Sequence, residues 1–366
     1  MIEFRNVTIL GLGLIGGSLA LALKKSGYDG TITGFDIARE NLEAATETGA
    51  IDRTAETVEG ALEYGGLIVI AVPLGAYDGI FRQIAAVAGD RSLIITDVGS
   101  VKGRIHSLAE ELLAPTVTFI GGHPMSGSEK GGFKAASATL FENAYYFLTP
   151  GKASPDIVEA LKGLVRQVGA FPVVITPAEH DQIAAQISHA PHVLASLLAN
   201  TLDAGNSVGH VAFAGGGFRD TTRIAAGDPL LWKDILTFNK KEVTAALAVV
   251  ESMLSEIRSA IAGGKEKELI DFLQRAKFIR DSLPGHGRSY LPDFYNIIVD
   301  VEDKPGIIGR LTQLVGEKCL NIREIEVLHV REENAKGAIR IGFASEAEQK
   351  AAARLLAEYQ FTITCS

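Results

Sequence analysis

The sequence contains only two cysteines, Cys319 and Cys365, both near its C-terminus. Two isolated thiols make neither a disulfide framework nor a zinc site, so we expect no bound metal and a protein of the reducing cytoplasm. A long apolar run is also lacking. The longest, Leu67–Ala76, is too short to cross a bilayer and contains Pro73. No basic segment or cleavage site opens the chain, which predicts neither a signal peptide nor a membrane partner.

Basic charge is scarce as well. The chain has 35 Lys and Arg residues against 44 Asp and Glu residues, a formal net charge of −9. Nucleic-acid binding needs a basic footprint, so this balance argues against nucleic acid as a general partner. An anionic ligand can still bind where a few arginines gather in one pocket. The length of 366 residues and the hydrophobic share of 47% are typical of a globular protein with more than one domain.

Strand-like and helical patterns alternate over the first half of the chain. Helical patterns such as Gly16–Ser26 and Pro155–Val168 lie between most of the apolar runs. This alternation predicts an α/β domain over 1–176, with a mostly parallel sheet covered on both faces. The expected strands are Val7–Gly11, Thr31–Asp36, Leu67–Pro73, Ser92–Val98, Thr118–Gly122, Ala144–Leu148 and Phe171–Thr176.

After Thr176 the periodicity is all helical. Thr176, Pro177 and Glu179 together predict a capped helix start. We expect an all-α domain over 177–285. One long helix carries an apolar stripe at spacings of three and four residues, which favours a homodimer seam over packing inside the subunit. The stripe consists of Val243, Leu247, Val250, Leu254, Ile257 and Ile261.

A glycine- and proline-rich linker is expected at 284–288, and a compact α+β module over 292–366. Its elements follow the order βαββαβ, the ferredoxin-like arrangement. The expected strands are Phe294–Val301, Ile322–Val330, Ala338–Ala344 and Phe361–Cys365, and the expected helices are Gly306–Lys318 and Glu346–Tyr359.

A glycine-rich turn, GLGLIG at 11–16, joins the first strand to the first helix. Gly11 permits the tight turn, Gly13 lets the backbone approach a pyrophosphate, and Gly16 lets helix and strand pack closely. The helix N-terminus then offers N–H groups to the phosphates. Asp36 ends the second strand, where a carboxylate accepts ribose hydroxyls and repels a 2′-phosphate. The pattern therefore predicts a Rossmann domain that binds NAD.

The carboxyl ends of the next two strands should border the nicotinamide half, because ligands bind at that edge of such sheets. Val72 and Pro73 end one strand, and residues 97–100 end the other. Arg39 could accommodate a phosphate, so NADP remains the lesser alternative. The predicted cofactor contacts are Gly11, Gly13, Leu14, Ile15, Gly16, Asp36, Val72, Pro73, Asp97 and Gly99.

His123 lies in a glycine-flanked segment, 121–127, just past an expected strand and so at the ligand edge of the sheet. A neutral imidazole near its ordinary pKa accepts a hydroxyl proton at pH 7, as the oxidation of an alcohol requires. His123 is therefore the candidate base. The alternative is a histidine that only bonds backbone at a turn.

Two further groups of residues lie in the helical part. His189 and His192 share a helix face, which Pro191 should kink toward the cleft. Their alternatives are a core pair or a zinc site, for which we find no third ligand. Arg219 and Arg223, four residues apart, suit a substrate carboxylate, although a solvated face is the plainer interpretation.

Together these segments resemble the prephenate/arogenate dehydrogenase family of tyrosine biosynthesis, in its bacterial form with a C-terminal ACT domain. The resemblance covers the whole chain. It rests on the 11–16 turn with Asp36, and on the segments 97–102, 122–127, 188–192, 218–225 and 228–229 with Trp232. The segment 303–306 resembles the first strand–helix turn of an ACT domain.

The resemblance implies NAD-dependent oxidative decarboxylation of prephenate to 4-hydroxyphenylpyruvate. His123 would take the proton of the substrate's 4-hydroxyl, and Ser100 would orient His123 or bond the same hydroxyl. Arg223 would hold a substrate carboxylate, assisted by Arg219. The implied substrate contacts are Arg223, Arg219, His192, His189 and Ser126.

Other functions remain open at this point. The chain could prefer arogenate or accept both substrates, as a cyclohexadienyl dehydrogenase does. More remotely, it could be a non-catalytic regulator that binds NAD or an amino acid. The ACT-like module implies feedback control, with tyrosine as the effector and Gly306 and Asn321 as candidate contacts. Its alternative is a dimerisation module that binds nothing.

Overall fold

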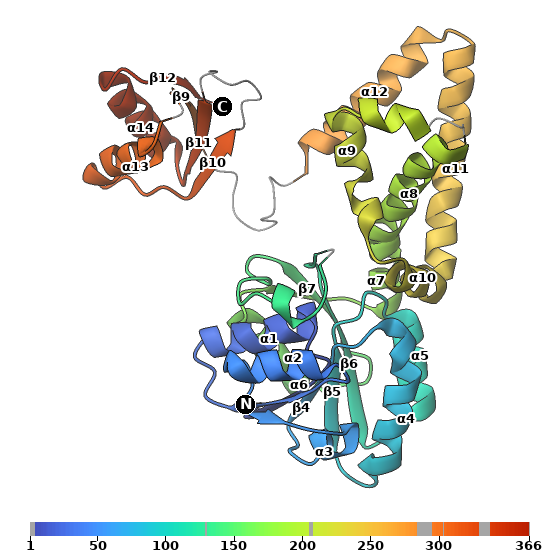
Figure 1. The fold of residues 1–366 in the computed structure, drawn as a ribbon. Helices are drawn as coiled ribbons and strands as arrows, with labels where there is room; N and C mark the ends of the chain where they lie inside the picture. Colours follow the sequence, from blue (N-terminus) through green and yellow to red (C-terminus); the bar gives the residue numbers. More distant parts are fainter. Residues whose placement is uncertain are drawn as a thin grey trace. The chain divides into compact units, whose positions relative to one another are not determined.

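The structure is a computed structural model that describes residues 4–128, 130–204, 208–283, 295–302, 304–328 and 337–365. The chain divides into two compact units, Met1–Ser282 and Leu283–Ser366 (Figure 1). The expected linker at 284–288 and the expected strand ends at Phe294 and Val330 lie outside the described residues.

An eight-stranded sheet of order β3-β2-β1-β4-β5-β6-β7-β8 begins the first unit. Every pairing in it is parallel except that of β6 with β7. This confirms the predicted Rossmann-like sheet, and its order reverses between β1 and β4, where such folds bind ligands. The strands are β1 (Asn6–Leu10), β2 (Thr31–Phe35), β3 (Arg53–Thr54), β4 (Leu67–Ile70), β5 (Leu93–Asp97), β6 (Val117–Pro124), β7 (Tyr145–Thr149) and β8 (Phe171–Val174).

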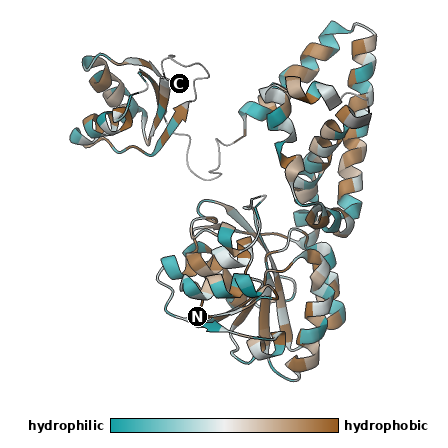
Figure 2. Ribbon diagram, viewed as in Figure 1, coloured by the Kyte–Doolittle hydropathy of each residue, from teal (hydrophilic) through white to brown (hydrophobic). Residues whose placement is uncertain are grey.

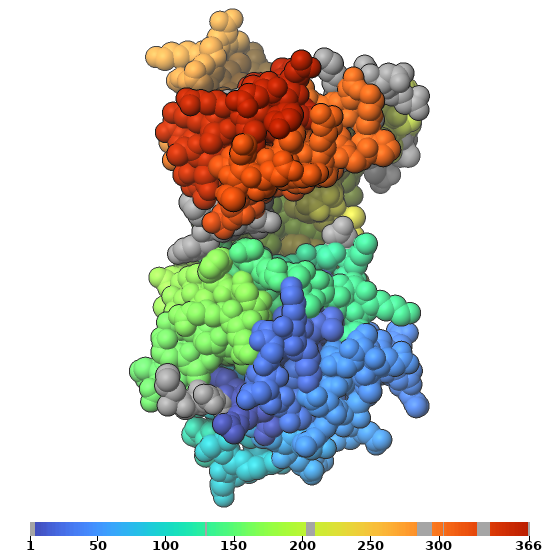
Figure 3. Space-filling model, turned by 90° about the vertical axis from the view of Figure 1, so that its left-hand side faces the viewer, coloured from blue at the N-terminus to red at the C-terminus, as the bar shows by residue number. Residues whose placement is uncertain are grey.

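Helices cover both faces of this sheet (Figure 1). One buried core joins the sheet to α1, α2 and α6, and a second joins it to α3, α4 and α5. The strands between them are largely hydrophobic (Figure 2), as strands buried on both faces should be. In Figure 3 the green chain around α6 lies against the blue N-terminal segments. The helices are α1 (Leu14–Lys25), α2 (Arg39–Glu47), α3 (Val58–Leu62), α4 (Tyr77–Ala88), α5 (Gly103–Leu112) and α6 (Pro155–Gln167), with the 3₁₀ turns η1 (Leu74–Ala76) and η2 (Phe133–Ala135).

The rest of the first unit is helical, as predicted. The Thr176 hydroxyl accepts the backbone N–H of Glu179, and the Glu179 carboxylate accepts that of Thr176, so the predicted capping box is confirmed. The elements are α7 (Pro177–Ala184), the π-helical turn η3 (Ala185–His189), α8 (Ala190–Ala204), η4 (Val208–Phe213), α9 (Gly216–Thr222), η5 (Arg223–Ala226), α10 (Pro229–Phe238), α11 (Lys240–Ala262) and α12 (Glu266–Asp281).

A π turn lies at the junction of α7 and α8, where the proline kink was expected. The π turn η3 ends two residues before Pro191, and α8 continues directly from it. Proline has no N–H and clashes with the preceding turn, and a π turn accommodates both defects without ending the helix.

The predicted apolar stripe lies on α11. Val243 at its start is buried, whereas Leu254 and Ile261 near its end are 62% and 64% exposed. A surface groove of about 670 Å³ follows this end, with Ile257 also in its wall. The second half of α11 therefore presents an uncovered apolar face.

No helix in the described ranges is long and apolar enough to cross a membrane.

The second unit has an antiparallel four-stranded sheet of order β10-β11-β9-β12, with the predicted βαββαβ order. Its own buried core includes Val299, Leu311, Phe343 and Leu356, from the sheet and from both helices. The elements are β9 (Tyr295–Val301), α13 (Ile307–Glu317), β10 (Glu324–Leu328), β11 (Gly337–Phe343), α14 (Glu346–Glu358) and β12 (Thr362–Cys365).

Candidate active site

The glycine turn after β1 has the shape that a pyrophosphate needs. Gly11 has φ +99°, and a Cβ there would lie 2.4 Å from the carbonyl oxygen of Ala71 at the end of β4. A Cβ at Gly16 would meet the carbonyl oxygen of Gly11 at 1.9 Å. Gly13, in contrast, faces open space, and no side chain caps the N-terminus of α1. Free N–H groups and an open approach at one helix end fit a dinucleotide's phosphates.

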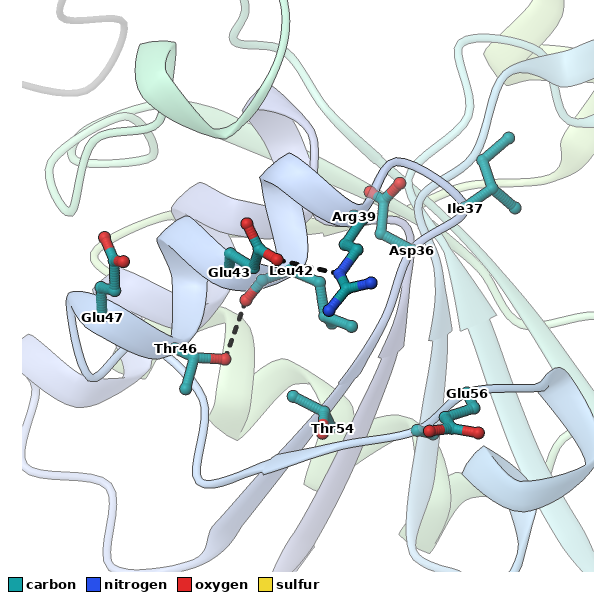
Figure 4. Close-up of a pocket in the computed structure, with 10 residues that line it drawn as sticks. Asp36, Ile37, Arg39, Leu42, Glu43, Thr46, Glu47, Thr54 and Glu56 are labelled. Atoms are coloured by element: carbon teal, nitrogen blue, oxygen red, sulfur yellow. Dashed lines mark hydrogen bonds and ion pairs between the residues drawn. The ribbon is translucent and has the colours of Figure 1, made fainter.

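Asp36 stands beside this turn at the end of β2. Its two carboxylate oxygens accept the backbone N–H groups of Leu12 and Ala38, each at 2.7 Å. A surface pocket of about 560 Å³ opens next to it, and Arg39 and Glu43 are in its wall (Figure 4). Nε of Arg39 lies 2.9 Å from a Glu43 oxygen, so the cation that could meet a 2′-phosphate has an acidic neighbour in an exposed ion pair.

The side chain of Asp97 points into the protein rather than toward the crevice where it was expected. Its side chain is fully buried, and its oxygens lie 2.6 and 2.5 Å from Nζ of Lys102. They also accept the N–H groups of Gly99 and Gly122 and the hydroxyl of Tyr77. The carboxylate therefore has no direction left for a cofactor, and it joins the ends of β5 and β6 instead. Val72 and Ser100 are half-buried, Pro73 is exposed and Gly99 is buried.

Lys102 is a buried residue that sequence reasoning missed. Its ammonium lies against Asp97 and donates to the carbonyl oxygen of Gly122 at 2.6 Å. Burial lowers the pKa of Lys102, although the charge of Asp97 opposes the shift. The lysine in segment 97–102 was the available signal, but the segment alone does not reveal which carboxylate the lysine meets.

His123 lies within β6, where it pairs with Phe147 of β7, and not beyond the strand as predicted. The strand runs on because the antiparallel β7 continues to pair with it after β5 ends. The side chain is 8% exposed, and Nδ1 lies 2.8 Å from Nε2 of His180 on α7. Nδ1 of His180 lies 2.8 Å from a carboxylate oxygen of Asp181. The pattern Asp181–His180–His123 was not predicted.

This chain of hydrogen bonds assigns the protons. A carboxylate only accepts, so Nδ1 of His180 carries a proton for Asp181. The other nitrogen of neutral His180 then accepts, and Nδ1 of His123 must donate to it. Nε2 of His123 is left unprotonated. It has no hydrogen-bond partner among the described residues, so it can accept a proton from outside the cluster.

The environment keeps these imidazoles neutral. Burial lowers the pKa of His123 well below 6.5, and the neighbouring His180, Lys102 and His189 add to the shift. Burial also lowers the pKa of His180, against the pull of Asp181. The pKa of His189 falls to about 4, again chiefly through burial. A neutral imidazole is the form that can act as a base.

Asp181 connects the two halves of the unit. Its carboxylate accepts the N–H groups of Lys102 and Gly103, each at 2.8 Å, at the start of α5. Its carbonyl oxygen accepts Nδ2 of Asn239 at 2.9 Å, and the same nitrogen lies 3.1 Å from Nδ1 of His189. His189 is 1% exposed. It is a connecting residue of the cluster, which does not favour the predicted contact with substrate.

His192 lies flat against Trp232, with ring centroids 3.5 Å apart and planes 11° from parallel. Nδ1 of His192 is buried and has no hydrogen-bond partner among the described residues. Gly227, which follows η5, packs so closely that a Cβ there would lie 2.4 Å from Nε1 of Trp232. An unpaired nitrogen in a buried site is costly unless a ligand supplies its partner.

The two arginines lie between His192 and Trp232 in sequence. Arg219 lies on α9, and Arg223 begins η5, so they do not share one regular helix as expected. Both are exposed, and neither has an ion-pair partner in the described part of the chain, Asp220 included. Both α9 and η5 pack on α8, the helix that carries His192.

Two predicted hydroxyls have different surroundings. Ser126 donates to the carbonyl oxygen of Leu140 at 2.5 Å and so helps to close the segment between β6 and β7. Ser100 is half-buried and makes no hydrogen bond to His123 in this structure.

In the second unit, Gly306 caps α13 with φ +87°, and Asn321 follows the other end of that helix. No group of three or more His, Cys, Asp or Glu side chains within the described ranges could hold a metal ion.

Comparison with known families gives two adjoining matches. Residues 19–175 match the family described as prephenate dehydrogenase, nucleotide-binding domain, and residues 176–275 match its dimerization domain. The chain is 38% identical over 361 residues to the prephenate dehydrogenase of Bacillus subtilis (strain 168), which covers 97% of each chain.

Solved structures agree with these matches. The prephenate dehydrogenase of A. aeolicus, in complex with hydroxyphenyl propionate and NAD+, is 31% identical with a TM-score of 0.71 and covers 77% of this chain and 99% of its own. The arogenate dehydrogenase of Synechocystis is 30% identical with a TM-score of 0.65 and covers 75% of this chain and 99% of its own.

Proposed function

The chain belongs to the prephenate dehydrogenase family, and we propose that the imidazole of His123 is the base of its reaction. The enzyme is an NAD-dependent dehydrogenase that oxidises and decarboxylates prephenate to 4-hydroxyphenylpyruvate. NAD, when bound, accepts the hydride that leaves C4 of the substrate. The glycine turn and Asp36 would hold this cofactor, since Gly13 leaves the approach to α1 open.

The observation that carries the proposal is the bond from Nδ1 of His123 to His180. It leaves Nε2 as the proton acceptor. Nε2 takes the 4-hydroxyl proton as the carbonyl forms at C4. Loss of CO₂ from C1 then sends the electron pair of the broken bond into the ring, and the oxygen at C4 becomes a phenolate. The protonated imidazole returns its proton to that phenolate, so the base is regenerated with no net uptake of protons.

The other predicted contacts would position the substrate's acid groups. Arg223 and Arg219 form no ion pair with any described residue, and a guanidinium binds a carboxylate through two parallel hydrogen bonds. His192 would give its buried Nδ1 a partner on the substrate's side chain. Ser100 remains the candidate for the hydroxyl end, and Ser126, whose O–H is used by Leu140, could contact the substrate only as an acceptor. Positioning of this kind is the main requirement, because formation of the aromatic ring drives the reaction forward.

We also propose that the chain is a homodimer through the exposed second half of α11. Leu254 and Ile261 lie in the part that matches a dimerization domain. An exposed apolar face of this kind is typical of helices that pack against a partner.

We propose the reducing cytoplasm as the compartment of this protein. Cys319 is a free, exposed thiol, which agrees with that proposal.

For the second unit we propose an ACT-like regulatory role with tyrosine as the effector. Gly306 precedes α13 and Asn321 follows it, and both remain the candidate contacts for this effector. Titration calorimetry with tyrosine, phenylalanine and tryptophan tests the idea, and the absence of heat with all three would remove it.

The function itself is tested by following NADH absorbance with prephenate or arogenate, against NAD or NADP, with and without tyrosine. We expect turnover with prephenate and NAD, and its loss in His123→Asn with binding of NAD retained. Arogenate, which carries an ammonium in place of the keto group, is the alternative substrate, and clearly faster turnover of arogenate would reassign the enzyme. No turnover with either substrate would refute the proposal.

A further inference from the structure

Asn41 makes two hydrogen bonds that point to different parts of the site. It lies in the first turn of α2, five residues after Asp36. Its Nδ2 donates to a carboxylate oxygen of Asp36 at 3.3 Å, and its Oδ1 accepts the backbone N–H of Phe133 at 3.0 Å. Both bonds are partly buried. One amide group therefore joins the carboxylate next to the cofactor pocket to a segment 92 residues away in the chain.

That segment, the described residues of 125–140, forms most of the connection from β6 to β7 and begins directly after His123 and Pro124. It is docked on the cofactor helices. The ring of Phe133 is buried so closely against α1 that a Cβ at Gly17 would lie 2.7 Å from it. The N–H of Ser137 donates to the hydroxyl of Ser18 on α1 at 2.9 Å. The blue-green chain beyond β6 borders the blue N-terminal segments in Figure 3.

The two anchors of this segment differ in what else they touch. Ser18 belongs to α1 and its hydroxyl is hydrogen-bonded to Ser137, whereas the amide of Asn41 is hydrogen-bonded to Asp36. A planar amide that donates at one end and accepts at the other has one orientation that satisfies both partners. Any change in the position of the Asp36 carboxylate is therefore passed to the N–H of Phe133.

We propose that Asn41 is a positioning residue that couples the cofactor's ribose site to the substrate side of the crevice. The proposal rests on the proposed role of Asp36 as the ribose carboxylate. With the carboxylate fixed by ribose hydroxyls, the amide of Asn41 is held in place, and it holds segment 125–140 behind His123. Such coupling is reciprocal. A substrate-like ligand must therefore raise the affinity of the protein for NAD by the same factor by which NAD raises the affinity of the protein for that ligand.

Titration calorimetry on the full chain measures this factor. The ligands are NAD and hydroxyphenyl propionate, which has no alcohol to oxidise, so each dissociation constant can be measured with and without the other ligand. We expect cooperative binding in the unaltered protein. In Asn41→Ala we expect NAD to bind about tenfold more weakly, as for a lost bond to a carboxylate, and the coupling factor to fall toward one.

Two other variants separate coupling from general damage. Asn41→Asp keeps an acceptor for Phe133 but sets a second carboxylate against Asp36, so it should lose NAD affinity and coupling while the segment stays docked. Ser18→Ala loosens the same segment from α1 without touching Asp36. This variant should weaken the binding of hydroxyphenyl propionate equally with and without NAD. The coupling factor would then be unchanged.

The outcomes distinguish the inference from its premise. If Asp36→Ala binds NAD as tightly as the unaltered protein, the cofactor role of Asp36 fails and the coupling loses its basis. If Asp36→Ala weakens the binding of NAD but both Asn41 variants keep the full coupling factor, only the inference about Asn41 is overturned. Independent binding of the two ligands in the unaltered protein would overturn it as well.

Discussion

Nζ of Lys102 lies 2.6 Å from the carbonyl oxygen of Gly122, the residue that precedes His123 in β6. A fully buried ammonium thus holds the backbone beside the candidate base. Its charge also contributes to the lowered pKa of His123, after burial and His180. One side chain out of reach of solvent therefore acts on the position and on the protonation of the imidazole.

Replacement of this lysine should cost much stability. In Lys102→Met the carboxylate of Asp97 stays buried without its cation, and breaking a buried ion pair in this way costs about 3–5 kcal/mol. Urea unfolding followed by circular dichroism measures the loss. Lys102→Met combined with Asp97→Asn should recover part of it, because the uncompensated charge is gone. A single variant as stable as the unaltered protein would contradict the assigned pairing.

Loss of His180 should slow turnover without abolishing folding. In His180→Asn the acceptor for Nδ1 of His123 is displaced, so the imidazole can adopt the unproductive tautomer. We expect kcat to fall about 100-fold, at the lower end of what a positioned base supplies, while the KM for NAD changes little. His106→Asn is the matched control, because His106 is also largely buried and hydrogen-bonded but touches Thr149 instead. Equal effects of the two variants would argue against an orienting role.

Mild acid should destabilise the first unit. Burial lowers the pKa of five histidines there, at positions 106, 123, 180, 189 and 192. Below pH 6.5 the unfolded chain binds protons that the folded chain refuses, so this stability is complete above pH 6.5 and is lost as the pH falls. For His189 the window runs from 6.5 down to about 4.

Calorimetric unfolding between pH 7.5 and 5 checks this sign. Each histidine adds at most about 1.4 kcal/mol per pH unit to the slope, and His189→Asn should reduce the slope by one such contribution. A melting temperature that does not change over this range would contradict the buried neutral state. The same shift predicts that kcat/KM keeps its value well below pH 6.5, since His123 stays unprotonated there.

Arg223→Ala should weaken substrate binding. We expect the KM for prephenate to rise by about tenfold or more, as for the loss of a hydrogen bond to a charged group, with the KM for NAD unaffected. Arg219→Ala should have a smaller effect in the same assay. If Arg219→Ala raises the KM for prephenate more than Arg223→Ala does, the substrate carboxylate lies nearer α9. If neither variant changes this KM, the anion site lies elsewhere.

Local sequence signals predicted most of the fold. Alternating apolar runs and the capping box at Thr176 predicted the correct elements. The spacing of buried residues and the residues that cap a helix are both encoded within a few positions of the sequence. The position of His123 was harder. Its strand continues only because β7 pairs antiparallel with it, and such pairing depends on a segment more than 20 residues away.

The hydrogen-bond network of the site was beyond local reasoning. His180 lies 57 residues from His123, and no spacing rule links them. Asp97 stands at a strand end that normally faces ligand, yet the buried Lys102 draws its carboxylate inward. Sequence patterns place residues at an edge of the sheet, but which neighbour each side chain finds depends on packing between elements.

The π turn at Ala185–His189 has a consequence for how this site tolerates change. Each residue of an α-helix advances the side-chain direction by about 100°. A wider turn holds one residue more than a regular one, so deletion of a single residue there would let the helix close into uniform α geometry. Because the wider turn takes up that residue, its removal would leave the direction of the following helix nearly unchanged. A deletion in the regular part of α7 would instead turn everything that follows by about 100° relative to the sheet. The π turn is therefore a position at which this helix could lose a residue and still present the same side chains to the site.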